Sequence, residues 1–225
     1  MRSRTVAIVP AAGSGRRLGM REKKPFVRLG GKPLIVYTLR SLNSSGYIDK
    51  IITATDASSV GRMKNIIKRY RIGKAVTVTA GGPTRSESVR NCFKLIEQPC
   101  DIVLIHDGAR PFPSKELIKS CIMSAKRHGA CIAAIGETDT VKLAGKDLFI
   151  KKTLDRSVLW RAQTPQAFKY DILKKAFFRA ARFKDETDDA SMVERIGKKV
   201  KILEGSARNI KITSKEDLKM AEVLL

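Results

Sequence analysis

Short apolar runs alternate with amphipathic segments along most of the chain. The runs are rich in β-branched residues, have the length of buried strands, and cover residues 5–10 (TVAIVP), 50–56 (KIITATD), 74–80 (KAVTVTA), 101–107 (DIVLIHD) and 130–136 (ACIAAIG). Helical patterns lie between them. Because strand and helix alternate, we predict a Rossmann-like α/β fold, a mostly parallel, twisted sheet with helices on both faces. Ligands of such folds bind at the carboxyl ends of the strands.

Residues that favour helix starts stand between the predicted strands. Pro33 suits the first turn of one helix, and Thr84 with Glu87 forms a capping-box pattern, T-x-x-E, at the start of another. Ser114 and Ser214 are typical N-cap residues. We therefore expect helices to begin at these places.

Two segments near the end of the chain carry further patterns. The stretch that starts at Thr187 (TDDASMVE) has acidic residues where the first turn of a helix favours them. Residues 209–213 (NIKIT) alternate and predict a short strand. Within it, Lys211 either extends its ammonium group to the solvent or points into a phosphate-binding pocket.

The alternation of strand and helix breaks after Gly136. Residues 140–155 (TVKLAGKDLFIKKTLD) instead alternate apolar and polar positions around 144–147, which predicts a β-hairpin that protrudes from the sheet. An isolated hairpin is marginally stable in water, so we expect it to pack against the same hairpin of a second subunit. We find no internal repeat or linker. The prediction is one domain, residues 1–225, that includes a dimerisation arm at 137–157.

The composition adds a strong positive charge to this picture. The chain has 225 residues, of which 43% are hydrophobic, and a formal net charge of +23. That charge predicts attraction to phosphorylated metabolites, nucleic acid or an anionic membrane, and does not choose among them. Because the basic residues are spread over the whole chain, a solvated cationic surface explains many of them equally well.

The four cysteines and two histidines argue against a zinc site. No cysteine pair has the spacing C-x-x-C, so we expect the cysteines to be small core residues in a reduced compartment. No apolar run has the length of a membrane span, and the run that begins at Val6 is too short for a signal peptide. We expect a soluble, cytoplasmic protein without a membrane partner.

The loop after the first predicted strand, VPAAGSGRRLGMREKKP (residues 9–25), combines small and basic residues. Its glycines at 13, 15 and 19 give G-x-G-x-x-x-G, which is one residue longer than the dinucleotide fingerprint, and it lacks the Gly-Lys-Ser/Thr of a P-loop. Small residues from Ala11 to Gly15 would let backbone N–H groups approach an anion. The basic residues that follow would suit a triphosphate, and the alternative is an ordinary solvated turn.

Two other loops also follow predicted strands. In HDGARP (residues 106–111), Asp107 could bind Mg²⁺ or accept a hydrogen bond from a substrate hydroxyl, and Arg110 could bind a phosphate. The alternative is that Asp107 caps a turn, and we expect His106 to be a packed, hydrogen-bonded residue. In GGPTRSESV (residues 81–89), Gly81 and Gly82 allow close backbone approach and Ser88 offers a hydroxyl; the alternative is an ordinary Gly-Gly turn before a capped helix. Arg156, just beyond the hairpin, is either a surface residue or completes the pocket of a second subunit.

The ordered set of motifs resembles a known family. AAGSGRRL, GG-x-x-R-x-x-SV, HDGARP, DTVK, LDRSVLW, TPQAF, TDDAS and NIKIT are similar, nearly end to end, to the 2-C-methyl-D-erythritol 4-phosphate cytidylyltransferases. The resemblance implies a nucleotide-diphospho-sugar transferase type of fold, a homodimer joined through the β-arm, and Mg²⁺ as cofactor. It also implies that CTP and methylerythritol phosphate react to give 4-diphosphocytidyl-2-C-methyl-D-erythritol and pyrophosphate, a step of non-mevalonate isoprenoid biosynthesis.

The resemblance also implies roles for individual residues. Arg17 and Lys24 match the basic pair that stabilises the transition state. The cytidine and triphosphate contacts match Ala11, Ala12, Gly13, Gly82 and Ser88, and Gly15 belongs to the same cradle of small residues. The methylerythritol phosphate pocket matches Asp107, Arg110, Thr140, Arg156 and Lys211. Among these, Arg110, Thr140 and Arg156 are expected from the partner subunit. Asp107 is also the candidate metal contact, directly or through water.

The sequence departs from the family pattern at a few positions. Around the catalytic lysine the family often has Pro-Lys-Gln, whereas this chain has Lys23-Lys24-Pro25, so Lys23 is a rival for the role. Pro83 stands where relatives often carry an acidic residue. Gly108 replaces a commoner alanine or serine.

Two other functions compete with this reading. A cytidylyltransferase for ribitol 5-phosphate or another sugar phosphate would share the nucleotide half of the site. A non-catalytic nucleic-acid-binding protein would explain the charge, but aromatic residues make up only 6% of the chain and no stacking platform is visible. We expect no specific nucleic-acid partner.

Overall fold

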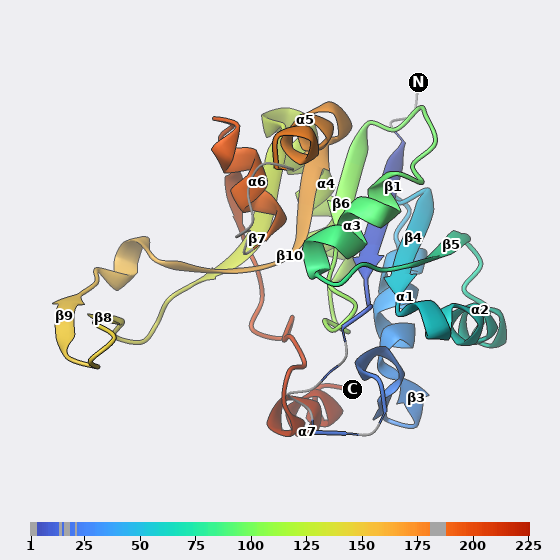
Figure 1. The fold of residues 1–225 in the computed structure, drawn as a ribbon, viewed down its shortest axis with the longest axis horizontal. Helices are drawn as coiled ribbons and strands as arrows, with labels where there is room; N and C mark the ends of the chain where they lie inside the picture. Colours follow the sequence, from blue (N-terminus) through green and yellow to red (C-terminus); the bar gives the residue numbers. More distant parts are fainter. Residues whose placement is uncertain (1–3, 14, 16–18, 21, 181–187) are drawn as a thin grey trace.

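The computed structural model describes residues 4–13, 15, 19–20, 22–180 and 188–225 (Figure 1). A seven-stranded sheet runs through the centre in the order β11-β7-β10-β6-β1-β4-β5. The bounds of its strands are β1 (Thr5–Pro10), β4 (Lys50–Thr55), β5 (Ala75–Ala80), β6 (Ile102–Ile105), β7 (Ala130–Gly136), β10 (Trp160–Lys169) and β11 (Lys201–Glu204).

The predicted Rossmann-like, mostly parallel sheet is confirmed. The five strands expected from the apolar runs form as β1, β4, β5, β6 and β7. β1 pairs parallel with β4 and β6, β4 with β5, and β7 with β11. β10 lies between β6 and β7, runs antiparallel to both, and was not predicted.

Helices cover both faces of this sheet (Figure 1). The α-helices are α1 (Leu34–Ser44), α2 (Val60–Arg69), α3 (Arg85–Phe93), α4 (Lys115–His128), α5 (Tyr170–Ala180), α6 (Asp189–Arg195) and α7 (Lys215–Val223). Short 3-10 helices are η2 (Lys24–Phe26), η3 (Ala57–Ser59) and η4 (Arg156–Val158). Within the described ranges, no helix is both long enough and apolar enough to span a bilayer.

The strands contribute side chains to two hydrophobic cores, one on each face of the sheet, because successive side chains of a strand point to opposite faces. Ala7 and Val9 of β1 pack with residues of α1, α2 and α4 on one face. Val6 and Ile8 pack with residues of α3, α5 and α6 on the other face. A third, smaller cluster joins α7 to the two-stranded sheet of β2 (Arg28–Leu29) and β3 (Lys32–Pro33).

The predicted helix starts are found, with one shift. Thr84 and Glu87 form the expected capping box at α3, and the Ser114 and Ser214 side chains cap α4 and α7. Pro33 is the N-cap of α1 and not a first-turn residue, because its ψ of 136° is extended and its backbone belongs to β3.

The strand predicted at 209–213 is wrong. These residues form no strand, and the backbone amide of Ile212 donates to the carbonyl oxygen of Ala109 at 2.9 Å. The alternating pattern has another origin, because Ile210 and Ile212 pack into the cluster beneath α7 while Lys211 lines a pocket.

The predicted hairpin forms from β8 (Lys142–Ala144) and β9 (Ile150–Thr153), which pair antiparallel in a sheet of their own. Figure 1 shows this pair far from the central sheet, at the end of two extended connections. Leu148 and Phe149 at its tip are 85% and 75% exposed. Its role as a dimerisation arm stays a prediction.

Candidate active site

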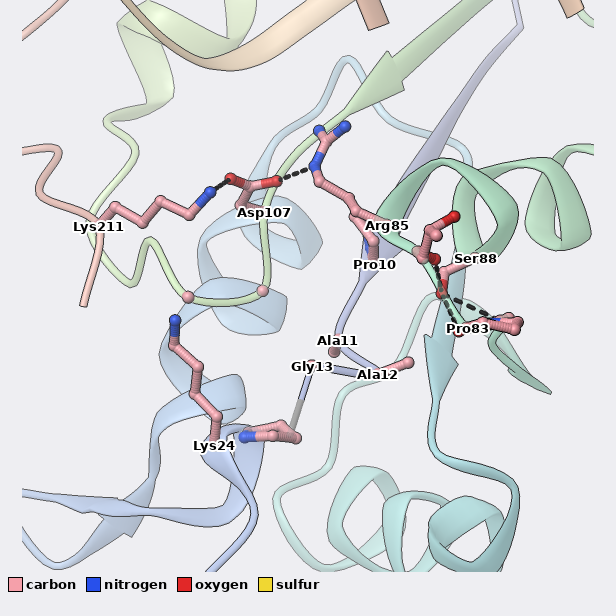
Figure 2. Close-up of a pocket in the computed structure, with 15 residues that line it drawn as sticks. Pro10, Ala11, Ala12, Gly13, Lys24, Pro83, Arg85, Ser88, Asp107 and Lys211 are labelled. Atoms are coloured by element: carbon pink, nitrogen blue, oxygen red, sulfur yellow. Dashed lines mark hydrogen bonds and ion pairs between the residues drawn. The ribbon is translucent and has the colours of Figure 1, made fainter. Parts of the chain in front are cut away.

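A pocket of about 290 Å³ lies where the chain leaves the carboxyl ends of β1, β5 and β6 (Figure 2). The loop after each of these strands contributes to its lining, together with η2 and residue 211. It brings together eight of the predicted site residues, Ala11, Ala12, Gly13, Lys24, Gly82, Ser88, Asp107 and Lys211. Parallel strands end at the same edge of a sheet, which is why segments so distant in sequence meet there.

Small residues allow the three loops to touch. A Cβ atom on Gly81 would lie 2.5 Å from the Cβ of Ala12 and 2.6 Å from the Oγ of Ser88. A Cβ atom on Gly108 would lie 2.9 Å from the Cβ of Ala11. Glycine at these two positions therefore lets the three loops pack closely together at the pocket.

The buried Ser88 side chain shapes the glycine loop. Its hydroxyl oxygen accepts a hydrogen bond from the Gly82 amide at 3.1 Å, and the hydroxyl donates to the carbonyl oxygen of Thr84 at 2.9 Å. These bonds fix the loop after β5 at the start of α3.

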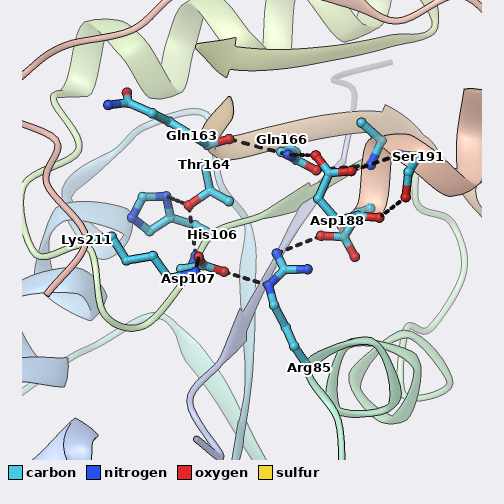
Figure 3. Close-up of polar contacts among 11 residues, drawn as sticks. Arg85, His106, Asp107, Gln163, Thr164, Gln166, Asp188, Ser191 and Lys211 are labelled. Atoms are coloured by element: carbon cyan, nitrogen blue, oxygen red, sulfur yellow. Dashed lines mark hydrogen bonds and ion pairs between the residues drawn. The ribbon is translucent and has the colours of Figure 1, made fainter. Parts of the chain in front are cut away.

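Asp107, in the lining of the pocket, is held between two cations (Figures 2 and 3). Its Oδ1 lies 2.8 Å from the Nε of Arg85, and its Oδ2 lies 2.7 Å from the Nζ of Lys211. Burial alone would raise the pKa of the Asp107 carboxyl, but the charges of Arg85 and Lys211 outweigh burial and hold the pKa well below its usual range. Asp107 is therefore an anion that can only accept hydrogen bonds.

Arg85 connects Asp107 to a second, deeper carboxylate. Its NH2 group lies 2.7 Å from the Oδ2 of Asp189, whose side chain is fully buried in the first turn of α6. Burial alone would lower the pKa of Arg85, but the charges of the two carboxylates raise the pKa by more than burial lowers it. The guanidinium therefore stays charged. Burial raises the pKa of Asp189, and the ion pair with Arg85 opposes that rise.

His106, next to Asp107, is buried and bonded at both ring nitrogens, and Figure 3 shows its bond with Thr164. Its Nε2 lies 3.0 Å from the carbonyl oxygen of Arg110, which can only accept, so Nε2 carries the proton. Nδ1 then accepts from the Thr164 hydroxyl at 3.2 Å, and the Thr164 oxygen accepts from the Asp107 amide at 3.0 Å. Burial lowers the pKa of His106 to about 4. The expectation of a packed, hydrogen-bonded histidine is confirmed.

The structure separates the two rival lysines. Lys24 lines the pocket, whereas the ammonium group of Lys23 binds Asp56 at 2.7 Å, outside the pocket. Gly15 lies beside Lys24, since a Cβ atom on Gly15 would be 2.9 Å from the Lys24 Cβ. Arg17, the other predicted catalytic residue, lies outside the described residues.

Three predicted substrate contacts do not line the pocket of their own chain. Arg110 is buried, and its NH1 group donates to the carbonyl oxygen of Asn209 at 2.6 Å. Thr140 is exposed at the base of the hairpin. Arg156 is exposed in η4 and donates to the carbonyl oxygen of Thr138 at 2.7 Å. Their expected contacts with the substrate of a partner subunit stay predictions.

The pocket offers little for direct metal coordination. In the described part of the chain, Asp107 is the one carboxylate of its lining, and no cluster of three or more His, Cys, Asp or Glu side chains could hold an ion. Both oxygens of Asp107 already face cations. This donor set suits Mg²⁺ that is held mainly by substrate phosphates and keeps several waters, because one carboxylate is then enough.

Sequence reasoning missed Arg85, Asp189 and Thr164. Each stands inside a quoted motif, GG-x-x-R-x-x-SV, TDDAS or TPQAF. The acids of TDDAS were predicted as a helix start, and Asp188 is indeed the N-cap of α6. The motifs were the available signal, but only tertiary structure shows which of their polar residues pair.

Comparison with known proteins places the chain among cytidylyltransferases. A family model described as 2-C-methyl-D-erythritol 4-phosphate cytidylyltransferase matches residues 5–225. The enzyme of that name from Syntrophus aciditrophicus (strain SB) is 43% identical over 229 residues, which cover 100% of this chain and 97% of the relative. The one from Alkaliphilus oremlandii (strain OhILAs) is 40% identical over 225 residues, which cover 99% and 95%. The crystal structure of 4-diphosphocytidyl-2C-methyl-D-erythritol synthase from Anaerococcus prevotii DSM 20548 has a TM-score of 0.88 and 31% identity, and covers 99% of this chain and 96% of that one.

Proposed function

The chain belongs to the 2-C-methyl-D-erythritol 4-phosphate cytidylyltransferase family, and from this premise we propose how its own residues perform the reaction. The enzyme joins CTP to 2-C-methyl-D-erythritol 4-phosphate and forms 4-diphosphocytidyl-2-C-methyl-D-erythritol and pyrophosphate. One observation carries the proposal. A single pocket holds a backbone-lined cradle, Lys24, and an anionic Asp107 between Arg85 and Lys211.

The cradle binds the nucleotide. Backbone groups of Ala11, Ala12, Gly13 and Gly15 bind the phosphates, because loops of small residues let N–H groups approach an anion closely. The loop of Gly82, fixed by Ser88, binds the cytidine end. Pro83 also lines the pocket, and since it has no N–H group it can offer only its carbonyl oxygen.

The transfer needs charge neutralisation more than proton transfer. The nucleophile is a phosphate oxygen that is already anionic at neutral pH, and it must approach a triphosphate of the same sign. Lys24 and Arg17 neutralise the negative charge that builds up at the α-phosphate, and such preorganised donors act strongly in a pocket that excludes water. His106 takes no part as a base, because both of its nitrogens are occupied.

Asp107 and Lys211 bind the second substrate. As an ionised carboxylate, Asp107 accepts hydrogen bonds from the hydroxyl groups of the methylerythritol chain. Lys211 lies on the same side of the pocket and binds its phosphate. Arg85 keeps Asp107 ionised and in place when Lys211 turns toward the phosphate.

Mg²⁺ accompanies CTP in this proposal. Substrate phosphate oxygens would hold it, with Asp107 in contact through water, and the ion would supply positive charge that weakens the repulsion between the two substrates. The chain itself provides the positions of the phosphates and of Asp107.

A second copy of the chain completes the site. The hairpin carries an exposed apolar surface, because Leu148, Phe149 and Ile150 are between 64% and 85% exposed. Exposed apolar patches of this kind mark interaction sites. A homodimer through the hairpin would bury them. Thr140 and Arg156, at the base of the hairpin, would then reach the partner's substrate phosphate, with Arg110 as a third contributor.

Pyrophosphate release tests the proposal. The purified full chain is assayed with CTP and Mg²⁺ across a panel that includes methylerythritol phosphate, ribitol 5-phosphate and other polyol phosphates. We expect turnover with methylerythritol phosphate, loss of turnover in EDTA, and recovery with added Mg²⁺. Turnover with ribitol 5-phosphate alone would contradict the substrate, and full turnover in EDTA would contradict the metal.

A further inference from the structure

The segment that carries Lys24 is fastened to the start of α2 by two ion pairs. The Nζ of Lys23 lies 2.7 Å from the Oδ1 of Asp56. Glu22, one residue earlier, forms a two-pronged pair with Arg62 of α2, with both N–O distances at 2.8 Å. The Arg62 guanidinium also lies over the ring of Phe26, 4.2 Å from its centroid. Residues on both sides of Lys24 in the sequence therefore contact the same region, residues 56–62 before and at the start of α2.

Lys23 uses all of its hydrogen-bonding capacity in this contact. Besides Asp56, its ammonium group donates to the hydroxyl oxygens of Ser58 at 2.9 Å and Ser59 at 3.4 Å. An ammonium group has three N–H donors, and the three oxygens account for them. The hydrogen bonds from Lys23 and Ser58 lower the pKa of Asp56 to about 2, so this carboxylate is ionised at neutral pH. Lys23 is thus a fixed contact and not a mobile cation for a phosphate.

The backbone turns sharply at this point and sends Lys24 the other way. The Phe26 amide donates to the carbonyl oxygen of Lys23 at 2.9 Å and closes the turn. Pro25 and Phe26 are buried, whereas Lys24 lines the pocket. Gly15 leaves no room for a Cβ atom beside the Lys24 Cβ. The stem of Lys24 is therefore confined between the loop after β1 and the fastened turn.

We propose that Lys23 is a positioning residue, which holds the turn on Asp56, Ser58 and Ser59 so that Lys24 is presented to the α-phosphate of CTP. The inference rests on the proposed role of Lys24 in the transfer. A displacement of about 1 Å at a reacting group can cost about 10²-fold in rate, so a contact that restricts the turn matters to catalysis. The same contact contributes little to overall stability, because both side chains are more than 40% exposed.

A double-mutant cycle in the full chain tests this role. The kcat for pyrophosphate release and the KM for CTP are measured for wild type, Lys23→Met, Lys24→Ala and the double variant. We expect Lys23→Met to lower kcat about tenfold with little change in KM. In the Lys24→Ala background, the same change should have no further effect, because nothing remains to be positioned. Lys68→Met, which removes an exposed lysine from α2, is the control for lost charge and should match wild type.

A second variant keeps the charges and removes hydrogen bonds alone. Ser58→Ala combined with Ser59→Ala should give a smaller loss of kcat that also disappears in the Lys24→Ala background. If the Lys23→Met loss persists in full in that background, or if Lys23→Met matches wild type, the positioning role is overturned while the proposed function stands. If Lys24→Ala itself keeps the wild-type rate, the proposed role of Lys24 fails and the positioning role falls with it.

Discussion

The pocket and the β8–β9 hairpin differ in how their side chains are placed: the pocket buries charged side chains, and the hairpin exposes apolar ones. At the pocket, buried charges are neutralised inside one chain, since Arg85 lies between Asp107 and Asp189 with both distances under 3 Å. At the hairpin, large apolar side chains such as Leu148 and Phe149 are left almost fully exposed. The charges of the first region are paired within its own chain, whereas the apolar side chains of the second are not covered by its own chain.

The difference teaches where a change will be felt. A buried ion pair that loses one partner leaves an uncompensated charge in a place without water. An exposed apolar side chain that is replaced loses nothing within its own chain. We therefore expect changes at the pocket to damage the fold, the chemistry or both, and changes at the hairpin to affect assembly and, through assembly, activity, while the fold of the single chain stays intact.

Removal of Arg85 should break the pocket most severely. In Arg85→Met, the fully buried Asp189 loses its ion-pair partner, and we expect the free energy of unfolding to fall by about 3–5 kcal/mol. Urea denaturation followed by circular dichroism measures it. Arg127→Met, at an exposed arginine near the end of α4, is the matched control and should change stability by less than about 0.5 kcal/mol. A loss below about 1 kcal/mol in Arg85→Met would show that the pair does not compensate buried charge.

Removal of Lys24 should separate chemistry from fold within the same pocket. We expect Lys24→Ala to lower kcat/KM for CTP roughly 10²–10³-fold, which corresponds to about 3–4 kcal/mol of transition-state stabilisation. The urea midpoint should stay close to that of wild type. Steady-state pyrophosphate release provides the rates, with Lys68→Met as the control. Kinetics similar to wild type would contradict the proposed role of Lys24 in stabilising the transition state.

The buried His106 should make stability depend on pH in a defined window. The native state keeps the imidazole neutral down to a pKa of about 4, whereas the unfolded chain protonates it near the ordinary value of about 6.5. Between these values the unfolded state binds more protons, so stability is complete above pH 6.5 and falls as the pH drops toward 4. The total loss is about 3 kcal/mol.

Comparison with His106→Asn isolates this contribution from other titrating groups. The difference in free energy of unfolding between wild type and variant should shrink by about 3 kcal/mol from pH 7 to pH 4. Urea denaturation at a series of pH values measures it. Parallel curves for the two proteins would mean that the histidine is protonated equally in both states.

The hairpin should give the smallest effect on the fold of the single chain. We expect Phe149→Asp to leave the monomer's free energy of unfolding within about 0.5 kcal/mol, because the ring is 75% exposed. Sedimentation velocity should show monomer in place of dimer, with lower activity. An unchanged dimer would show that the interface does not use the hairpin. A large loss of far-UV circular dichroism would show that the hairpin, like the pocket, supports the fold of the single chain.

Apolar pattern predicted much of the sheet and failed where polar residues are buried. The β1, β4, β5, β6 and β7 strands are short runs made up of apolar residues and threonine, apart from their end residues. β10 is not such a run, because Gln163, Thr164 and Gln166 lie within it and are buried. A register shift between residues 162 and 166 turns these side chains toward neighbouring loops, where they find hydrogen bonds. A strand of that kind carries no hydrophobic signature.

The site was predictable to the extent that it is built from backbone. Glycine and alanine loops after strands identified the cradle, and Asp107 was found by its place after an apolar run. Arg85 and Asp189 were not found, because their importance lies in a pairing across about a hundred residues of sequence. Nothing local distinguishes Asp189 from the adjacent helix cap, Asp188.

The position of β10 has a consequence for how the chain acquires its shape during synthesis. β6 and β7 follow one another in sequence, yet β10 lies between them in the sheet. Until residues 160–169 have been made and have left the ribosome, β6 keeps an open edge and β7 lacks its antiparallel neighbour. Arrival of Trp160–Lys169 joins the two halves. It also delivers Thr164, which anchors Asp107. The sheet and the pocket are therefore completed late in translation, and a nascent chain must keep two strand edges apart until then.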